Sequence, residues 1–532
     1  MVQARSARET AELLDSGTPV ALLDIRDPLD YTRGHIRACT PVPRGELETR
    51  LPELVPNPKT PVVLCDRQGD RAEADCRWLS RLGYTDVSYL DGGIEAWKQA
   101  GYELIESVDD VYSTAFNYDS KAFGERVEER SDLPKLTPEE LERKLASDDT
   151  LVVDVRTPEE YDELKTIPGA MNVEGVDVAL YLDALRRPDQ DVVINCAGRT
   201  RSIIGTATLR TLGFENVYEL ENGTMGWQLA GFDLDDGRGR PSTDQRVDEA
   251  RYEQLRRSAG RLLDESDAAR LSPDGLDALK DRVDPTQSVY LLDVRTHDEF
   301  RNGHVPGSHS SPGGQLIQTT DQQIAVRAGE IVLISETDVR ASITAYWLSE
   351  MGLSNVSVLE GGIAAWKDAD RPVEDGDGSV EAVGSDVLAE YADYTSPVEL
   401  SALVDDAAVT VVDVGDSARY EDGHVPGAVW VPRYELEHVL GADVPLDDPV
   451  VLTCEDGTVS EFAVAQLRAE REIETVSALR GGVAAWRDAG FDVETGNDGW
   501  LFEPRTAAEK PYQQSKRAME TYLEWEENML EN

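Results

Sequence analysis

Cysteine and long apolar runs are both scarce in this chain. Its 532 residues include five cysteines, an odd number, and no Cys-x-x-Cys pair. This composition excludes a disulfide framework and gives no signal for a zinc ribbon. No apolar run approaches the roughly 20 residues that a membrane-spanning helix needs, and residues 1–17 lack the apolar segment of a signal peptide. The sequence therefore predicts a protein of the reducing cytoplasm with no membrane partner.

Positive charge is also in short supply. Lys and Arg number 52 against 104 Asp and Glu, which gives a formal net charge of -52. Such a chain would repel a phosphate backbone, so the sequence predicts no nucleic-acid partner. The acidic residues are spread along the whole sequence. This distribution is typical of proteins adapted to high salt, and an ordinary acidic cytosolic protein is the alternative.

Two motifs occur four times in the chain. One is a strand-like run that ends in Asp, and the other is a glycine turn followed closely by Trp. The Asp and the Trp are 73 residues apart in every copy, which indicates one fold used four times. The four pairs are Asp24 with Trp97, Asp154 with Trp227, Asp293 with Trp366, and Asp413 with Trp486.

Each copy alternates strand-like and helix-like segments. In the first copy, residues 20–23, 61–64 and 86–90 predict strands, and residues 72–82 predict an amphipathic helix. This alternation predicts the α/β class, with four tandem domains that each contain a mostly parallel sheet flanked by helices. The predicted domains span 1–105, 132–235, 262–374 and 388–495, and a helical tail over 496–532 is expected to dock on one of them.

The stretch 194–202 carries the clearest chemical signal. A buried strand over 192–194 leads into Cys196, a tight loop with Arg199 and Arg201, and a helix over 202–212. A helix N-terminus and neighbouring arginines both lower the pKa of a thiol. Cys196 is therefore predicted to be a thiolate nucleophile. A buried structural cysteine is the alternative.

Taken together, these motifs resemble the rhodanese (thiosulfate sulfurtransferase) family. The matching pieces are the strand-ending Asp-x-Arg, the Gly-His or Ile-Pro-Gly-Ala turn, the Cys-x-x-x-x-Arg loop of Cys196 and Arg201, and the glycine turn before Trp. The resemblance implies small α/β domains in which a loop cysteine accepts a sulfane sulfur as a persulfide. It implies an enzyme that needs no metal or organic cofactor.

A gapless comparison of the four copies indicates which domain is active. The first loop position holds Asp66, Cys196, Ser335 and Glu455, and the arginine position holds Arg71, Arg201, Arg340 and Ser460. Domain 2 is therefore predicted to be catalytic and domains 1, 3 and 4 inactive. Cys65 and Cys454 fall one residue before the loop in this register, and a compensating insertion and deletion would bring either one into it.

The spacing of Cys65 and Arg71 allows a rival interpretation for the first copy. Their Cys-x5-Arg loop has the length used by phosphatase and arsenate-reductase domains that resemble rhodaneses. Asp66 and Asp70 lie inside this loop and would repel phosphate, so the phosphatase interpretation is disfavoured. Cys39 and Cys76 lie outside any loop of this kind and are predicted to be structural.

The resemblance implies a two-step transfer at domain 2. Cys196 would take the outer sulfur of thiosulfate or another small sulfur anion, and a thiophilic acceptor such as cyanide, a small thiol or a protein thiol would remove it. The predicted catalytic residues are Cys196 and Arg201, and the predicted substrate-binding residues are Ala197, Gly198, Arg199, Thr200 and Ser202. A non-enzymatic sulfur carrier or scaffold built from rhodanese-like modules is the alternative.

Several polar residues of the repeats are predicted to have structural roles. A Gly-His pair occurs in three copies, but the second copy, which has the best nucleophile, carries Lys165 instead. The histidines are therefore expected to form structural hydrogen bonds rather than to act as bases. Asp154 and Arg156 are expected to form an ion pair, and the repeated Trp is expected to lie in the core.

Overall fold

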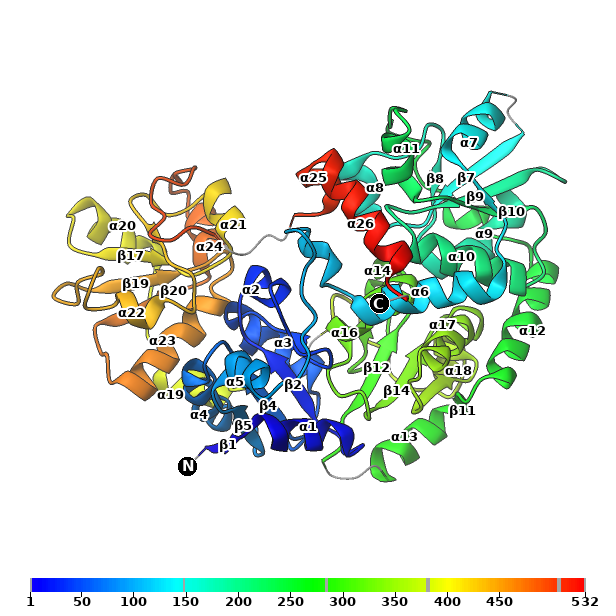
Figure 1. Cartoon of the computed structure of the whole chain (residues 1–532). Coiled ribbons are helices and arrows are strands. Elements are labelled where there is room, and N and C mark those ends of the chain that lie inside the picture. Colours follow the sequence, from blue (N-terminus) through cyan, green and yellow to red (C-terminus); the bar gives the residue numbers. More distant parts are fainter. Residues whose placement is uncertain (1, 147–148, 283–285, 379–382, 505–508, 531–532) are drawn as a thin grey trace. The chain divides into compact units, whose positions relative to one another are not determined.

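The chain folds as two compact units that each contain two of the four repeats (Figure 1). The computed structural model describes all residues except 1, 147–148, 283–285, 379–382, 505–508 and 531–532. The first unit comprises Met1–Leu104 and Val380–Ala508, and the second comprises Ile105–Ser379 and Glu509–Asn532. The first and fourth repeats therefore share one unit, and the second and third repeats share the other.

Each repeat forms one five-stranded sheet, and every described pairing within these sheets is parallel. The strand order is the same in all four, for example β6-β10-β9-β7-β8 in the second repeat. This result confirms the predicted α/β class with four parallel sheets. The strands are β1 Gln3–Arg5, β2 Ala21–Asp24, β3 Thr40–Pro41, β4 Val62–Cys65, β5 Val87–Leu90; β6 Lys135–Leu136, β7 Thr150–Asp154, β8 Met171–Asn172, β9 Asp191–Asn195, β10 Val217–Leu220; β11 Ala269–Leu271, β12 Val289–Asp293, β13 His309–Ser310, β14 Glu330–Ile334, β15 Val356–Leu359; and β16 Tyr394–Thr395, β17 Thr410–Asp413, β18 Val429–Trp430, β19 Val450–Thr453, β20 Val476–Leu479.

Helices flank each sheet, and two of them end the chain. In the first repeat they are α1 Ala7–Asp15, α2 Pro28–Thr32, α3 Leu47–Leu54, α4 Asp70–Arg81 and α5 Gly93–Gln99. In the second they are α6 Tyr118–Ser131, α7 Pro138–Leu145, α8 Pro158–Leu164, α9 Val178–Leu185, α10 Thr200–Thr211 and α11 Gly223–Leu229, followed by α12 Glu249–Glu265. The third has α13 Pro273–Arg282, α14 His297–Arg301, α15 Gly313–Gln318, α16 Thr320–Gln323, α17 Val339–Glu350 and α18 Gly362–Asp368. The fourth, with the tail, has α19 Ser385–Tyr391, α20 Pro397–Asp405, α21 Ser417–Asp422, α22 Leu436–Val439, α23 Thr458–Arg471, α24 Gly482–Asp488, α25 Pro511–Gln514 and α26 Lys516–Asn528.

Local sequence explains where the helices of the second repeat begin. Thr-Pro-Glu-Glu occurs at 137–140 and again at 157–160. In both places the Thr hydroxyl accepts the N–H of the second Glu, and that Glu side chain caps the Thr backbone in return. Proline at the first helical position adds a suitable backbone angle. These signals start α7 and α8, and α8 carries Glu160 to the site described below.

The repeated tryptophan lies in the core of every repeat, as predicted. Trp227 packs with Val152, Val193 and Leu220 from three strands of its sheet. Its indole N–H donates to the carbonyl of Asp233 at 2.9 Å. The equivalent bonds run from Trp97 to Glu103, from Trp366 to Pro372 and from Trp486 to Asp492. In each repeat the tryptophan therefore anchors the segment that follows the last helix of the domain.

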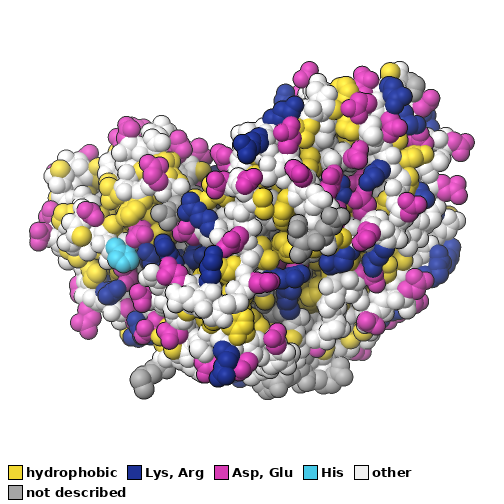
Figure 2. All heavy atoms as spheres, in the orientation of Figure 1, with side chains coloured by type: hydrophobic (Ala, Val, Ile, Leu, Met, Phe, Trp, Pro, Cys, Tyr) yellow, Lys and Arg dark blue, Asp and Glu magenta, His cyan; other side chains and the backbone are white. Residues whose placement is uncertain are grey.

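The charge of the surface follows the composition. Acidic side chains are scattered over the face shown in Figure 2, with basic side chains among them. Among the helices that the structure describes, none is both long enough and apolar enough to cross a membrane.

Candidate active site

Cys196 occupies the first position of the loop between β9 and α10. Its carbonyl accepts the N–H of Thr224 at 2.9 Å, and the carbonyl of Ala197 accepts the N–H of Met225 at 3.1 Å. The turn that begins α11 thus fixes the backbone of the loop through these two hydrogen bonds. Gly223 has a φ of +54°, and a Cβ there would lie 2.3 Å from the Cys196 carbonyl oxygen, so this close approach requires glycine. The fold places the thiol beside the N-terminus of α10, as predicted.

The C-terminal helix covers this loop. Met519, Tyr522 and Leu523 of α26 form one apolar cluster with Met225 of α11 and Val111. The helix α26, red in Figure 1, contacts both α6 and α11. The predicted tail over 496–532 is divided, because it belongs to the second unit only from Glu509 onward. Within that part α26 docks over Cys196, a position that the sequence does not predict. The apolar and aromatic residues of this amphipathic helix are the sequence signal for docking.

The covered site is a cavity of about 80 Å³. Cys196 is only 2% exposed. The hydroxyl of Thr200 donates to Glu526 Oε1 of α26 at 2.9 Å, so one predicted substrate-binding group is occupied by the tail. The cavity is lined by the predicted residues Cys196, Ala197, Gly198, Arg199, Thr200 and Arg201, together with Lys121, Glu160, Met225, Lys510, Tyr512, Tyr522 and Glu526, among others. Ser202 lies behind the sulfur, where the thiol donates to its hydroxyl at 3.5 Å.

Both arginines of the loop are paired with carboxylates from other helices. Arg201 binds Glu160 of α8 through both terminal nitrogens. Arg199 binds Glu125 of α6 at 2.7 and 2.8 Å and also contacts Glu128. The loop itself contains no acid, so its sequence predicts unopposed positive charge there. In the folded site the carboxylates offset the arginines, so the net charge around Cys196 is closer to zero than the loop sequence predicts.

The pKa of Cys196 is also opposite to the sequence prediction. Burial raises the pKa of the Cys196 thiol, because a thiolate loses its hydration beneath α26. The charge of Arg201 and the hydrogen bonds from Ser202 and the N–H of Gly198 act in the other direction but do not overcome burial. The resting thiol therefore keeps its proton at neutral pH.

In the first repeat, an aspartate fills the loop where the thiol would lie. The Asp66 carboxylate accepts the backbone N–H groups of Gln68 and Arg71, both at 2.9 Å, and of Gly69 and Ala72. A ring of N–H groups at a helix start is an anion site, and here the protein's own carboxylate occupies it. Cys65 ends strand β4 and does not begin the loop, so the position that a phosphatase nucleophile would need holds Asp66.

The third repeat has lost the thiol and uses its arginine elsewhere. The Ser335 hydroxyl donates to the carbonyl of Thr337 at 2.7 Å. Arg340, which corresponds to Arg201, binds Glu299 and also Asp177 of the second repeat at 3.1 Å. This arginine therefore joins two domains of the same unit.

The fourth repeat corrects the gapless register. Asp413 pairs with Thr453, whereas Asp154 pairs with Asn195. Cys454 therefore begins its loop, in the position of Cys196, and its sulfur lies 3.7 Å from the Ser460 hydroxyl. One residue is missing before the loop, and one is gained before the glycine turn. Val459 then takes the position of Arg201, so the fourth loop has a thiol but no arginine.

The loop of the fourth repeat is also more acidic than that of the second. Glu455 and Asp456 follow the cysteine, and Gly415 stands where the other repeats have the arginine that pairs with Asp. Burial raises the pKa of Asp413 to about 7. Burial likewise raises the pKa of Cys454 to about 11. These groups disfavour a thiolate and an anionic donor.

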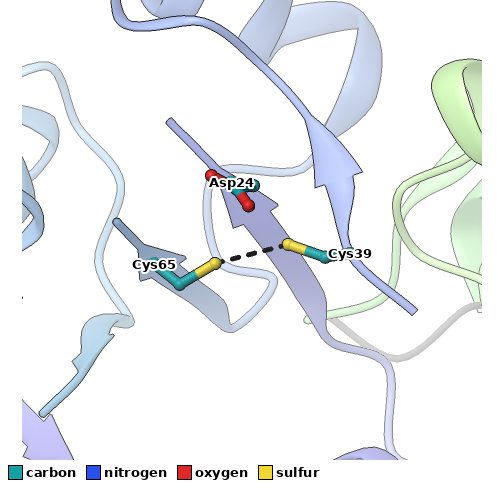
Figure 3. A group of neighbouring side chains, drawn as sticks. All are labelled: Asp24, Cys39 and Cys65. Carbon is teal, nitrogen blue, oxygen red and sulfur yellow. Dashed lines mark hydrogen bonds between the residues drawn. The ribbon is translucent and has the colours of Figure 1, made fainter. Parts of the chain in front are cut away.

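The remaining cysteines lie in the core of the first repeat. The sulfurs of Cys39 and Cys65 are 3.4 Å apart, beside Asp24 (Figure 3). Thiols and a carboxylate are zinc-type ligands, but Arg26 takes both oxygens of Asp24, and burial raises the pKa of both thiols. Cys76 donates to the Ser88 carbonyl at 3.2 Å. The group packs as a buried cluster, in line with the structural role predicted for Cys39 and Cys76.

The histidines and the Asp-x-Arg pair have the structural roles predicted for them. His304 stacks on Phe300 with ring centres 3.8 Å apart, and its Nδ1 lies 3.1 Å from the Phe300 carbonyl. His35 and His424 repeat this arrangement with Tyr31 and Tyr420. Asp154 and Arg156 form a buried ion pair at 2.7 Å.

The second repeat is thus an α/β domain in which a cysteine lies between the carboxyl end of a parallel strand and the start of a helix. The chain belongs to the rhodanese family: the model of the rhodanese-like domain matches residues 6–100, 137–230, 273–369 and 396–489.

Similar proteins include one that matches over the full length of this chain. The crystal structure of thiosulfate sulfurtransferase from Pseudomonas aeruginosa is 34% identical, has a TM-score of 0.90 and covers 100% of this chain and 97% of its own. The 3-mercaptopyruvate sulfurtransferase of Escherichia coli strain K12 is 22% identical over 270 residues, which are 40% of this chain and 93% of that protein. A thiosulfate sulfurtransferase of Pseudomonas aeruginosa is 25% identical over 241 residues, 38% of this chain and 85% of that protein.

Proposed function

We propose that this protein is a sulfurtransferase that carries a sulfane sulfur as a persulfide on Cys196. The observation that carries the proposal is the position of this thiol at the first loop residue, at a helix start, with Arg201 on the same cavity wall. The similar proteins are named for thiosulfate and for 3-mercaptopyruvate. Both compounds are small sulfur anions, and Arg201, although paired with Glu160, lies on the cavity wall where its guanidinium could bind them.

The reaction proceeds in two steps. The Cys196 sulfur attacks the outer sulfur of thiosulfate, the S–S bond of the donor breaks, and sulfite leaves with the bonding electrons. The persulfide anion is held by loop N–H groups and by Arg201. A thiol or cyanide then attacks the terminal sulfur and releases Cys196. The steps require no metal or organic cofactor.

Intact mass after treatment with thiosulfate tests this proposal. The wild type is expected to gain one sulfur, about 32 Da, as a persulfide, and Cys196→Ser is expected to gain none. Cys454→Ser is the matched control, because it removes the other loop thiol, and it is expected to load like the wild type. A gain that survives Cys196→Ser but disappears in Cys454→Ser would move the chemistry to the fourth repeat.

A sulfur carrier is the second candidate, and the cover over Cys196 favours it. A thiol that is 2% exposed suits storage of a persulfide that only a dedicated partner removes. A carrier would load one sulfur and stop, whereas an enzyme would release sulfite continuously with cyanide present. Sulfite measured over many equivalents of protein separates the two.

A further inference from the structure

A buried carboxyl group lies beneath the Cys196 loop. Glu219 is the third residue of β10, is 1% exposed, and pairs in register with Ile194 of β9. The Ser202 hydroxyl lies 3.4 Å from Glu219 Oε1 and 3.5 Å from the sulfur of Cys196. Glu219 Oε2 has no hydrogen-bond partner among the described residues. A chain of three polar groups thus connects the sulfur to the carboxyl.

The other repeats show that the fold does not need this glutamate. The third residue of the equivalent strand is Tyr89, Val358 or Ala478. Glutamate is disfavoured in strands, and a buried carboxyl is costly. The position of Ser202 is taken by Ala72, Ala341 and Ser460. The combination of cysteine, serine and glutamate therefore occurs in the second repeat only.

Charged groups surround Glu219 on each side. Glu125 and Glu128 face it from α6, Lys135 faces it from β6, and Arg199 faces it from the loop. Burial, followed by the charge of Glu128, raises the pKa of Glu219 to about 8, against the opposing charges of Arg199 and Lys135. The group can therefore exchange a proton in the pH range where sulfur chemistry takes place.

We propose that Glu219 is a positioning residue that holds the proton of Cys196 during sulfur transfer and receives it through the hydroxyl of Ser202. The inference rests on the proposed function. It answers a need of the covered site, because a thiol beneath α26 must lose its proton when it attacks. The Ser202 hydroxyl has two acceptors, the Arg199 carbonyl at 2.8 Å and Glu219 Oε1. When the Ser202 hydroxyl rotates from the Arg199 carbonyl to Glu219 Oε1, the proton path from Cys196 to Glu219 is complete.

The proton balance closes over the two half-reactions. In the first, the S–H bond of Cys196 breaks, its proton passes to Ser202 Oγ, and the Ser202 proton passes to the Glu219 carboxylate. The freed electron pair of the sulfur forms the new S–S bond, and sulfite departs with the electrons of the donor S–S bond. In the second, an acceptor thiol takes the terminal sulfur and keeps its own proton on the new persulfide. The Cys196 thiolate then regains the stored proton from Glu219 through Ser202.

The pH dependence of Cys196 alkylation by iodoacetamide tests the path without any sulfur donor. The rate for the Cys196 peptide is followed by mass spectrometry from about pH 6 to about pH 10, a range that spans thiol ionisation. The wild type is expected to reach half its maximal rate near pH 8, where Glu219 becomes a carboxylate. Glu219→Gln keeps the shape but cannot take a proton. Its half-maximal point is expected to move above about 8.5, the ordinary thiol value, with a loss of about tenfold or more at pH 8.

Two further variants separate the path from a structural effect. Ser202→Ala breaks the chain in the middle and is expected to match Glu219→Gln, and the double variant is expected to be no slower than either single one. Glu215→Gln, at an exposed carboxyl of the same domain, is expected to match the wild type. The profiles of wild type and Glu219→Gln should meet at high pH, where Cys196 ionises unaided.

Coincident profiles for wild type and Glu219→Gln would overturn the inference. So would a Glu219→Gln rate that stays low at high pH, because that result means a damaged loop. Failure of the wild type to gain sulfur from thiosulfate, with the alkylation profiles as expected, would refute the proposed donor chemistry and leave the proton path standing.

Discussion

Leu523→Asp is expected to make Cys196 react with iodoacetamide at least about tenfold faster at neutral pH, a change of about 1.4 kcal/mol or more in access to the thiol. Leu523 is 5% exposed in the apolar cluster that seats α26. A carboxylate there loses its hydration without gaining a partner, which costs several kcal/mol, so the helix should leave its seat. Water then reaches the sulfur.

The same variant is expected to shift the alkylation profile to lower pH. Burial is the main cause that raises the pKa of Cys196, and Arg201 opposes it. Displacing α26 hydrates the thiol and so removes the effect of burial. Arg201 and the N-terminus of α10 remain, and both favour a thiolate. The wild-type thiol is therefore covered at rest, and we expect displacement of the tail to make it more reactive.

Leu530→Asp is the matched control for this experiment. Leu530 follows the same helix but is 40% exposed, so a charge there should leave the helix seated and the rate unchanged. The other four cysteines belong to the first unit and serve as internal controls, because a specific effect leaves their alkylation as it was. An unchanged Cys196 rate in Leu523→Asp would mean that α26 does not limit access.

The fold was predictable because its signals are local and repeated. The central strands β7 and β9 of the second sheet contain short apolar runs, and the Thr-Pro-Glu-Glu segments contain all the residues of a capped helix start. The constant distance from Asp to Trp then fixed the number of domains. Neither inference requires knowledge of what lies across the domain.

Constant spacing concealed the position of Cys454. A residue lost before the loop and one gained after it cancel in the distance from Asp413 to Trp486. Only the pairing of Asp413 with Thr453 reveals the shift. A gapless comparison therefore places this thiol at the end of a strand, whereas with the insertion and deletion it begins the loop.

The electrostatics of the site depend on contacts between distant segments. Glu125 and Glu160 lie 74 and 41 residues before the arginines that they neutralise, and Glu526 lies 326 residues after Thr200. Inside the stretch 194–202 the sequence shows only positive charge. The sequence alone does not distinguish Glu219 from other strand residues, because its place beneath the loop depends on its register with Ile194.

Arg340→Met is expected to lower the free energy of unfolding of the second unit by about 3 to 5 kcal/mol at neutral pH, because it leaves the buried carboxylate of Asp177 without its partner. Arg340 is 2% exposed and binds Glu299 at 2.6 and 3.0 Å and Asp177 at 3.1 Å. Glu299 retains Arg246 at 2.9 Å, whereas Asp177 loses the only ion pair that it forms within the described part of the chain. Urea-dependent labelling of Cys196 measures the effect, because this is the one cysteine of the second unit.

The loss of unfolding free energy in Arg340→Met, relative to the wild type, is expected to be smaller at acid pH than at neutral pH. Arg340 and Arg246 hold the pKa of the Glu299 carboxyl well below its ordinary value, so this group stabilises the wild type above about pH 4.3 and loses that contribution as the pH falls. Arg340→Met lacks most of this stabilisation from the start, so acid removes less from the variant than from the wild type.

Arg201→Met, at the equivalent position of the second repeat, removes a partner from Glu160 alone. It should therefore cost less stability, but it should slow sulfur loading of Cys196. Equal deficits at neutral and acid pH would show that packing, and not the ion pairs of Arg340, joins the two domains.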